Sequence, residues 1–317
     1  MRILLTGVAG FIGSHLLSRF LGDGHEVVGV DNFLTGKMSN VEAVLALDDG
    51  YARRFALHRE DIRDAEAMIR LSAGCDAIVH EAAIGSVPWS IHDPMLAHET
   101  NLTGFLHILE AAKAHGIRRV VYASSSAVFG DATGVPAVEG REGAALSVYA
   151  SSKRAQEIYA ESYARCYGLE IVGLRYFNVF GARQDPNGPY AAVIPRWIAA
   201  MRAGQACTIF GDGSATRDYC HVSNIVEANC LAMTVPLPCP SVALNVGCGH
   251  ETSLLALHDI LAHEMRRMGI DVLPPTLAPP RAGDIERSCA DISRARDILG
   301  YAPRTSVADG LRELVGA

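Results

Sequence analysis

The residues best suited to acid–base chemistry are Tyr149 and Lys153, which lie four positions apart. On a helix this spacing places the phenol and the ammonium group on one face. A phenol ordinarily loses its proton near pH ~10, but a nearby positive charge stabilises the phenolate and lowers that pKa. A phenolate near neutrality can remove the proton of a hydroxyl group. Because the same spacing is common on ordinary amphipathic helices, the pair alone does not establish a catalytic site.

Three serines, Ser124, Ser125 and Ser126, lie at the end of a predicted strand, Arg119–Ser124. The carboxyl ends of parallel strands form the edge at which α/β sheets bind ligands. Together with the glycine turn described next, these serines favour a catalytic role for the tyrosine and the lysine.

The glycines Gly7, Gly10 and Gly13 connect a predicted strand, Arg2–Thr6, to a predicted helix, Gly13–Gly22. Glycines at this spacing let the chain turn sharply, let a pyrophosphate approach the backbone and let the helix pack on the strand. The phosphates then lie at the positive end of the helix. Three glycines recur by chance in many turns, but the strand–turn–helix context indicates a dinucleotide-binding turn.

Asp31 ends the second predicted strand, Glu26–Asp31, where a carboxylate can accept hydrogen bonds from the adenosine ribose. A carboxylate there repels a 2′-phosphate, so NAD is favoured over NADP. The alternative is that Asp31 only terminates the strand, and Asn32 is consistent with both interpretations. Lys37 either caps the ribose or lies on a solvated loop.

The first half of the chain alternates short apolar runs with longer helical patterns, which predicts a Rossmann-type, doubly wound parallel α/β sheet. The predicted strands are Arg2–Thr6, Glu26–Asp31, Arg54–Arg59, Ala77–His80, Arg119–Ser124 and Ile171–Tyr176. The predicted helices are Gly13–Gly22, Ala65–Ala73, Met95–His115 and Tyr149–Tyr167.

After residue 176 this rhythm breaks, and turn-forming residues cluster at 184–189, 210–214, 236–240 and 274–281. We therefore expect a cofactor-binding domain over residues 1–176 and a smaller, loop-rich α/β substrate-binding domain over 177–317, with some exchange of segments between them.

Composition narrows the class of protein further. The chain has 317 residues, 49% hydrophobic and 20% charged, and a formal net charge of −7, which argues against a nucleic-acid binder. No segment reaches the ~18 consecutive apolar residues of a membrane span. The eight cysteines form no C-x-x-C pair, so we expect free thiols and no metal site. Met1 leads directly into a predicted strand and leaves no room for a signal peptide, which predicts a cytoplasmic protein.

Taken together, the glycine turn, the Tyr149-x-x-x-Lys153 pair and the strand-end Ser125 resemble the extended short-chain dehydrogenase/reductase family. The resemblance covers essentially the whole chain and is strongest to the nucleotide-sugar 4-epimerases. It implies bound NAD, a UDP-sugar substrate and a homodimer formed through the helices at Met95–His115 and Tyr149–Tyr167.

Several further segments carry this resemblance. They are Leu174–Gly181, Tyr190–Trp197, Thr216–Tyr219 and Arg281–Asp284, which resemble the parts of these enzymes that contact the nicotinamide and the nucleotide diphosphate. His80-Glu81-Ala82-Ala83 occupies the place of the strand end beneath the cofactor, but Glu81 replaces the usual apolar residue.

The resemblance implies a set of site residues. The catalytic residues are Ser125, Tyr149 and Lys153, with Lys153 lowering the phenol pKa. Those that bind cofactor are Gly7, Gly10, Phe11, Ile12, Gly13, Asp31, Asn32, Lys37, Asp61, Ile62, Ala82, Ala83, Asn101, Ser124, Tyr149, Lys153 and Tyr176. Those that bind substrate are Ser86, Ser125, Ser126, Tyr149, Asn178, Ala192, Val193, Trp197, Arg217, Arg281, Asp284 and Ser288. Arg217 and Arg281 are expected on the diphosphate, since each guanidinium can fork onto phosphate oxygens.

Two positions bear on the reaction and the sugar. Ser126 and Ala127 follow Ser125 where the related dehydratases carry an Asp–Glu pair, so no acid–base pair is offered for elimination. Ser288 aligns with the position that limits substrate size, and a small residue there admits a 2-acetamido group. We therefore predict interconversion of UDP-GlcNAc and UDP-GalNAc, with UDP-glucose and UDP-galactose also tolerated. The alternatives are a UDP-glucuronate decarboxylase or uronate 4-epimerase and, in a different class, a non-catalytic NAD-sensing regulator.

Overall fold

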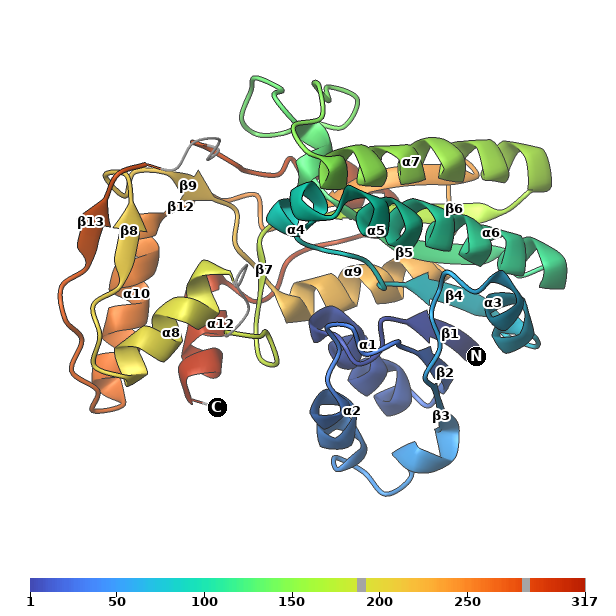
Figure 1. Ribbon diagram of the computed structural model, residues 1–317, viewed down its shortest axis with the longest axis horizontal. Coiled ribbons are helices and arrows are strands. Elements are labelled where there is room, and N and C mark those ends of the chain that lie inside the picture. The colour runs from blue at the N-terminus through green and yellow to red at the C-terminus, as the bar shows by residue number, and fades with distance from the viewer. Residues whose placement is uncertain (187–191, 281–285, 317) are drawn as a thin grey trace.

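The computed structural model describes residues 1–186, 192–280 and 286–316, and its centre is a seven-stranded parallel sheet (Figure 1). The order across the sheet is β11-β6-β5-β4-β1-β2-β3. The strands are β1 (Arg2–Thr6), β2 (Glu26–Val30), β3 (Phe55–His58), β4 (Ala77–His80), β5 (Arg119–Ser125), β6 (Glu170–Tyr176) and β11 (Ser241–Val246). This arrangement confirms the predicted Rossmann-type fold class.

The direction in which strands are added reverses between β1 and β4. From β1 the chain adds β2 and β3 on one side, then returns to place β4, β5 and β6 on the other. Connections leave β1 and β4 toward opposite faces of the sheet, so a crevice opens between the carboxyl ends of these two strands.

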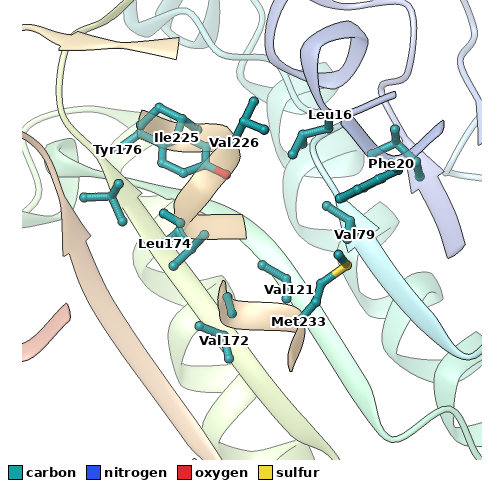
Figure 2. Close-up of a cluster of buried hydrophobic side chains, with 14 of the residues drawn as sticks. Leu16, Phe20, Val79, Val121, Val172, Leu174, Tyr176, Ile225, Val226 and Met233 are labelled. Atoms are coloured by element: carbon teal, nitrogen blue, oxygen red, sulfur yellow. The ribbon is translucent and has the colours of Figure 1, made fainter. Parts of the chain in front are cut away.

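Helices cover both faces of the sheet. They are α1 (Phe11–Gly22), α2 (Met38–Leu45), α3 (Ala65–Ser72), α4 (Val87–His92), α5 (Pro94–His98), α6 (Gly104–His115), α7 (Val148–Tyr167), α9 (Val222–Thr234) and α11 (Ser293–Leu299). On one face α1 and α9 pack on the sheet, where Phe20 and Met233 lie over Val79 and Val121 (Figure 2). On the other face α3, α6 and α7 bury Phe105, Tyr122, Ala160 and their neighbours.

Two of these elements come from beyond residue 176. Strand β11 pairs with β6 along its whole length, and α9 packs against α1, so part of the second half completes the sheet and its cover. The predicted helix over Met95–His115 also differs from the structure, because a π-helical turn, Glu99–Thr103, separates α5 from α6. This turn directs the Asn101 side chain inward, where its Oδ1 accepts a hydrogen bond from the Ile84 N–H (2.8 Å).

The smaller region lies at the left of Figure 1 and has its own core. It contains α8 (Val193–Arg202), α10 (Leu254–Arg267) and α12 (Val307–Gly316), with the short strand pairs β7 (Val179–Phe180) with β10 (Cys220–His221), β8 (Thr208–Phe210) with β13 (Thr276–Ala278), and β9 (Thr216–Arg217) with β12 (Thr252–Ser253). Trp197, Leu257, Leu261 and Leu311 are buried together there. None of the helices in the described residues is long and apolar enough to cross a membrane.

Candidate active site

In the glycine turn after β1, backbone segments pack directly against one another. Gly7 has a φ of +69°, and a Cβ there would lie 2.7 Å from the Ala82 nitrogen. A Cβ on Gly13 would lie 2.0 Å from the Gly7 carbonyl oxygen. Real Cβ atoms do not approach backbone atoms this closely, so both positions require glycine. The turn thereby brings the start of α1 against the end of β1.

The first turn of α1 faces this crevice with free backbone donors. Gly10 precedes the helix and has no side chain to cap it, so among the described residues no side chain accepts from the first-turn N–H groups. Such a helix start binds phosphate through its N–H groups and its dipole. Gly7, Gly10, Phe11, Ile12 and Gly13 all line the adjoining cavity.

Asp31 holds the backbone after β2 and beside the glycine turn, and it also lines a cavity where it could bind a ribose. Its Oδ2 accepts from the Ala9 N–H (2.9 Å) and its Oδ1 from the Phe33 N–H (2.8 Å), which fixes the carboxylate beside the turn. Burial raises its pKa, and the two hydrogen bonds oppose that rise. Asp31 also lines a small cavity of about 90 Å³ together with Asn32, Ile62 and Ala82. This cavity is the end of the crevice suited to an adenosine ribose.

Helix α7 brings the catalytic candidates together. Its cap is Ser147, whose Oγ accepts from the Ala150 N–H (3.0 Å), and Tyr149 lies in its first turn. Tyr149 hydrogen-bonds to Ser125 at the end of β5. One turn further along α7, Lys153 is 2% exposed and donates from Nζ to the Ala123 carbonyl oxygen (2.8 Å). The structure therefore places Ser125, Tyr149 and Lys153 at one site.

The pKa of Tyr149 departs from the expectation that Lys153 lowers it. Burial raises the pKa of the phenol, Glu81 raises it further, and the hydrogen bond from Ser125 lowers it. Lys153 Nζ lies 6.0 Å from the centre of the tyrosine ring, and burial lowers the pKa of Lys153 to about 8. Desolvation opposes both charged forms, so the protein groups alone hold the proton on the phenol. A positively charged nicotinamide, when bound, is the further charge that favours phenolate.

Glu81 belongs to a partly buried polar network at the same place. Tyr176 Oη donates to Glu81 Oε1 (2.7 Å), and Asn229 Nδ2 donates to Tyr176 Oη (2.8 Å). Burial raises the pKa of Glu81 to about 7, whereas the Tyr176 hydrogen bond and the charge of Lys153 lower it. The sequence singled out Glu81 as unusual but did not reveal its partners, because Asn229 lies on α9 and Tyr176 on β6.

A second buried network joins the sheet to the loop between β5 and α7. Arg175 contacts Glu157 through two hydrogen bonds of 2.8 Å, and its Nη1 lies 2.6 Å from Glu142 Oε1. Ser124 Oγ donates to Glu157 Oε1 (2.8 Å). The guanidinium also lies 5.0 Å from the centre of the Phe129 ring. Sequence reasoning missed this network, since its members come from four separate segments.

A string of cavities runs from the glycine turn into the smaller region. The first, about 400 Å³, is lined by the glycine turn, Ser124, Ser125, Tyr149, Lys153 and Tyr176. Asn178 connects it to a cavity of about 270 Å³ lined by Ala192, Val193 and Trp197. Arg217 connects that one to a cavity of about 370 Å³ lined by Ser126 and Ser288. Ala83 lines both the first cavity and the ribose cavity of Asp31.

Other predicted residues have different contacts. Lys37 pairs with Asp185 (2.8 Å) and does not line these cavities. Asp61 accepts from Asn32 Nδ2 (2.8 Å). Burial would raise the pKa of Asp61, but the hydrogen bonds from Arg63 and Asn32 lower it to about 2. Asn101 is fully buried and holds the Ile84 backbone, and Ser86 caps α4. Arg281 and Asp284 lie outside the described residues.

The donor set fits a dinucleotide and shows no arrangement for a metal ion. Within the described ranges, no three His, Cys, Asp or Glu side chains are grouped as metal ligands. The glycine turn, the uncapped helix start, Asp31 and the buried Lys153 all face one continuous crevice at the reversal of strand order. That position is where doubly wound sheets bind dinucleotides.

Comparison with known proteins agrees with this geometry. The family model described as "NAD dependent epimerase/dehydratase family" matches residues 3–247, which is most of the chain. The chain therefore belongs to this family, and NAD is its cofactor.

Within this family, the chain is similar to several UDP-sugar 4-epimerases. The chain is 38% identical to a UDP-glucose 4-epimerase of Mycolicibacterium smegmatis over 99% of this chain and 97% of the relative. The UDP-glucose 4-epimerase of Thermotoga maritima, solved with UDP-glucose, superposes with a TM-score of 0.90 at 35% identity, covering 100% of this chain and 98% of that one. A UDP-N-acetylglucosamine 4-epimerase of Methanobrevibacter ruminantium, solved with UDP-N-acetylmuramic acid, has a TM-score of 0.91 at 34% identity, covering 99% and 97%.

Proposed function

We propose that the protein is an NAD-dependent UDP-sugar 4-epimerase that interconverts UDP-GlcNAc and UDP-GalNAc and also accepts UDP-glucose and UDP-galactose. The observation that carries this proposal is the meeting of Ser125, Tyr149 and Lys153 in the cavity that also holds the glycine turn. This cavity shares Ala83 with the cavity of Asp31 and Asn178 with the neighbouring substrate cavity.

Each catalytic residue has a role in this proposal. Tyr149, as phenolate, removes the proton of the C4 hydroxyl and later returns it. Ser125 bridges that hydroxyl and the phenol, which eases the proton transfer. Lys153 contributes positive charge to the phenolate and a donor for the cofactor ribose. The chemistry that NAD supplies when bound is the reversible acceptance of the C4 hydride.

The substrate region has a group suited to hold the nucleotide and open space in which the sugar can turn. Arg217 stands between two cavities, where its guanidinium suits a diphosphate. Ser288 lines the third cavity, of about 370 Å³, together with small residues such as Ala127 and Gly130. A small side chain at Ser288 leaves room for a 2-acetamido group. The 4-keto sugar would turn there about its diphosphate linkage before reduction on its opposite face.

Purified protein incubated with UDP-GlcNAc and no added reductant tests the proposal. We expect UDP-GalNAc to accumulate to a fixed ratio, measured by anion-exchange chromatography. Tyr149→Phe should reduce this conversion by about a thousandfold or more while NAD stays bound, because general base catalysis is lost together with the phenolate charge. Full conversion by Tyr149→Phe would reject the mechanism. Release of CO2 from UDP-glucuronate would instead indicate the decarboxylase, and no turnover of any UDP-sugar would indicate a sensor.

We further propose a cytoplasmic homodimer formed through the helices predicted for it, α5, α6 and α7, together with the neighbouring α4. Ile91, Met95, Ile158 and Tyr159 expose apolar surface on these adjacent helices. Contiguous exposed apolar side chains are typical of subunit interfaces. Ile158→Glu should convert the dimer to a monomer in sedimentation experiments, whereas Leu277→Glu, an equally exposed site on β13, should not. A wild-type monomer at micromolar concentration would contradict the dimer.

A further inference from the structure

Glu81 is a partly buried acid that the proposed mechanism does not use. It follows β4 directly, and its backbone N–H donates to the Thr6 carbonyl oxygen at the end of β1 (3.3 Å). The side chain thus stands where the strand order reverses, in the crevice that takes the cofactor. It lines both the ribose cavity and the catalytic cavity. A carboxylate in such surroundings is costly to bury without compensating partners.

The groups around Glu81 come from several elements, and within the described part of the chain Lys153 is the cation that acts on it. On β6, Tyr176 donates to it, and Asn229 of α9 holds that tyrosine in place. On β4, His80 bonds to Thr6 Oγ1 (2.7 Å), and burial lowers its pKa to about 3, so it is neutral. From α7, Lys153 and Tyr149 line the same cavity as Glu81 and interact electrostatically with it.

Glu81 raises the pKa of both residues, which favours catalysis at Lys153 and opposes it at Tyr149. Its negative charge raises the pKa of Lys153, whose burial acts the other way, and so keeps the ammonium charged. The same charge raises the pKa of Tyr149 and so holds its proton more tightly. Bringing a charge near a buried pair shifts both titrations in the same direction.

We propose that Glu81 is a positioning residue of the reaction: held by Tyr176 and Asn229 in the cavity that Tyr149 and Lys153 also line, its carboxylate is the fixed counter-charge of Lys153 and opposes the loss of the proton from Tyr149. This inference rests on the proposed role of Tyr149. With Glu81 ionised, the charges of Lys153 and Glu81 balance one another whether the phenol is charged or neutral.

Phenolate formation in the NAD-loaded enzyme without substrate tests this directly. The titration of Tyr149 is followed by ultraviolet difference absorbance, with loaded Tyr149→Phe protein as the blank. Glu81→Gln removes the charge but keeps an oxygen to accept from Tyr176. We expect the Tyr149 midpoint to move to lower pH by about one unit, a tenfold larger dissociation constant. The pH profile of kcat/KM on UDP-GlcNAc should move the same way.

Glu161→Gln is the matched control, because it makes the same change on an exposed turn of α7 where Glu161 pairs with Arg165. Its Tyr149 midpoint should equal that of the wild type. If Glu81→Gln does not fold with NAD bound, Tyr176→Phe replaces it: loss of the donor raises the pKa of Glu81, so the midpoint moves in the same direction by less.

Equal midpoints in wild type and variant overturn this inference alone. A wild-type phenol that keeps its proton to pH ~10 overturns the inference and the proposed general base together.

Discussion

The cofactor crevice and the substrate cavities are built in different ways. The crevice is fixed by contacts of backbone with backbone, such as Gly13 against the Gly7 carbonyl, and by the carboxylate of Asp31 bonded to two N–H groups. The substrate cavities are lined mainly by side chains from loops and short helices far apart in the sequence, such as Phe129, Trp197, Arg217 and Ser288.

This difference suits a cycle in which one ligand stays and another turns over. A binding surface made of backbone contacts changes little, whereas one lined by side chains can alter its shape through single substitutions. We therefore expect substitutions in the crevice to affect every substrate equally, and substitutions in the substrate cavities to distinguish one sugar from another.

The largest effect is expected in the crevice. Gly13→Ala places a Cβ 2.0 Å from the Gly7 oxygen, so the turn must shift and the phosphate site with it. We expect loss of bound NAD, measured by cofactor release from denatured protein, and loss of activity on all UDP-sugars. Gly22→Ala on the same helix meets only the end of the Tyr51 side chain, at 3.3 Å, and should keep its NAD. Normal NAD content in Gly13→Ala would show that the turn tolerates displacement.

A smaller loss is expected in the buried network that joins the sheet to the loop before α7. Arg175→Gln leaves Glu157 and Glu142 without their buried cation, which typically destabilises a protein by about 3–5 kcal/mol. Urea unfolding should show this loss, and KM for the sugar nucleotide should rise because the loop before α7 is released. Arg165→Gln, which breaks an exposed pair on α7, serves as the control and should change stability by less than about 1 kcal/mol.

Substitution of Ser288 should change the selectivity between sugars while the protein keeps its NAD. A tyrosine there fills part of the third cavity, so Ser288→Tyr should lower kcat/KM for UDP-GlcNAc roughly tenfold or more while leaving UDP-glucose turnover nearly unchanged. Ser288→Ala should keep both substrates. Equal losses on the two sugars would show that Ser288 does not limit substrate size.

The smallest effect is expected at Lys37. Its ammonium pairs with Asp185 on the surface, with both side chains nearly half exposed, and such pairs are worth about 0–1 kcal/mol. Lys37→Ala should therefore leave NAD content and kcat/KM within about twofold of wild type. A large loss of NAD would restore the alternative in which Lys37 caps the ribose.

Patterns within a few residues allowed much of this molecule to be predicted. The glycine spacing, the strand-end serines and the Tyr149–Lys153 pair each encode local geometry, and six strands of the sheet follow from short apolar runs. The structure then brought Ser125, Tyr149 and Lys153 together, because strand ends share one edge of a parallel sheet. The resemblance they carry led to the family and to NAD.

What the sequence by itself determined, then, is six strands of the sheet, the turn that meets the cofactor and the types of the catalytic residues. The tertiary structure alone decided that β11 and α9 complete the sheet, that Asn101 supports a loop and that Glu81 is bonded to Tyr176. It also added the burial and the Glu81 charge that, among the protein groups, raise the pKa of Tyr149. The reason is physical: spacing fixes which side chains share a face, whereas burial and charge sum over every segment that packs around a group.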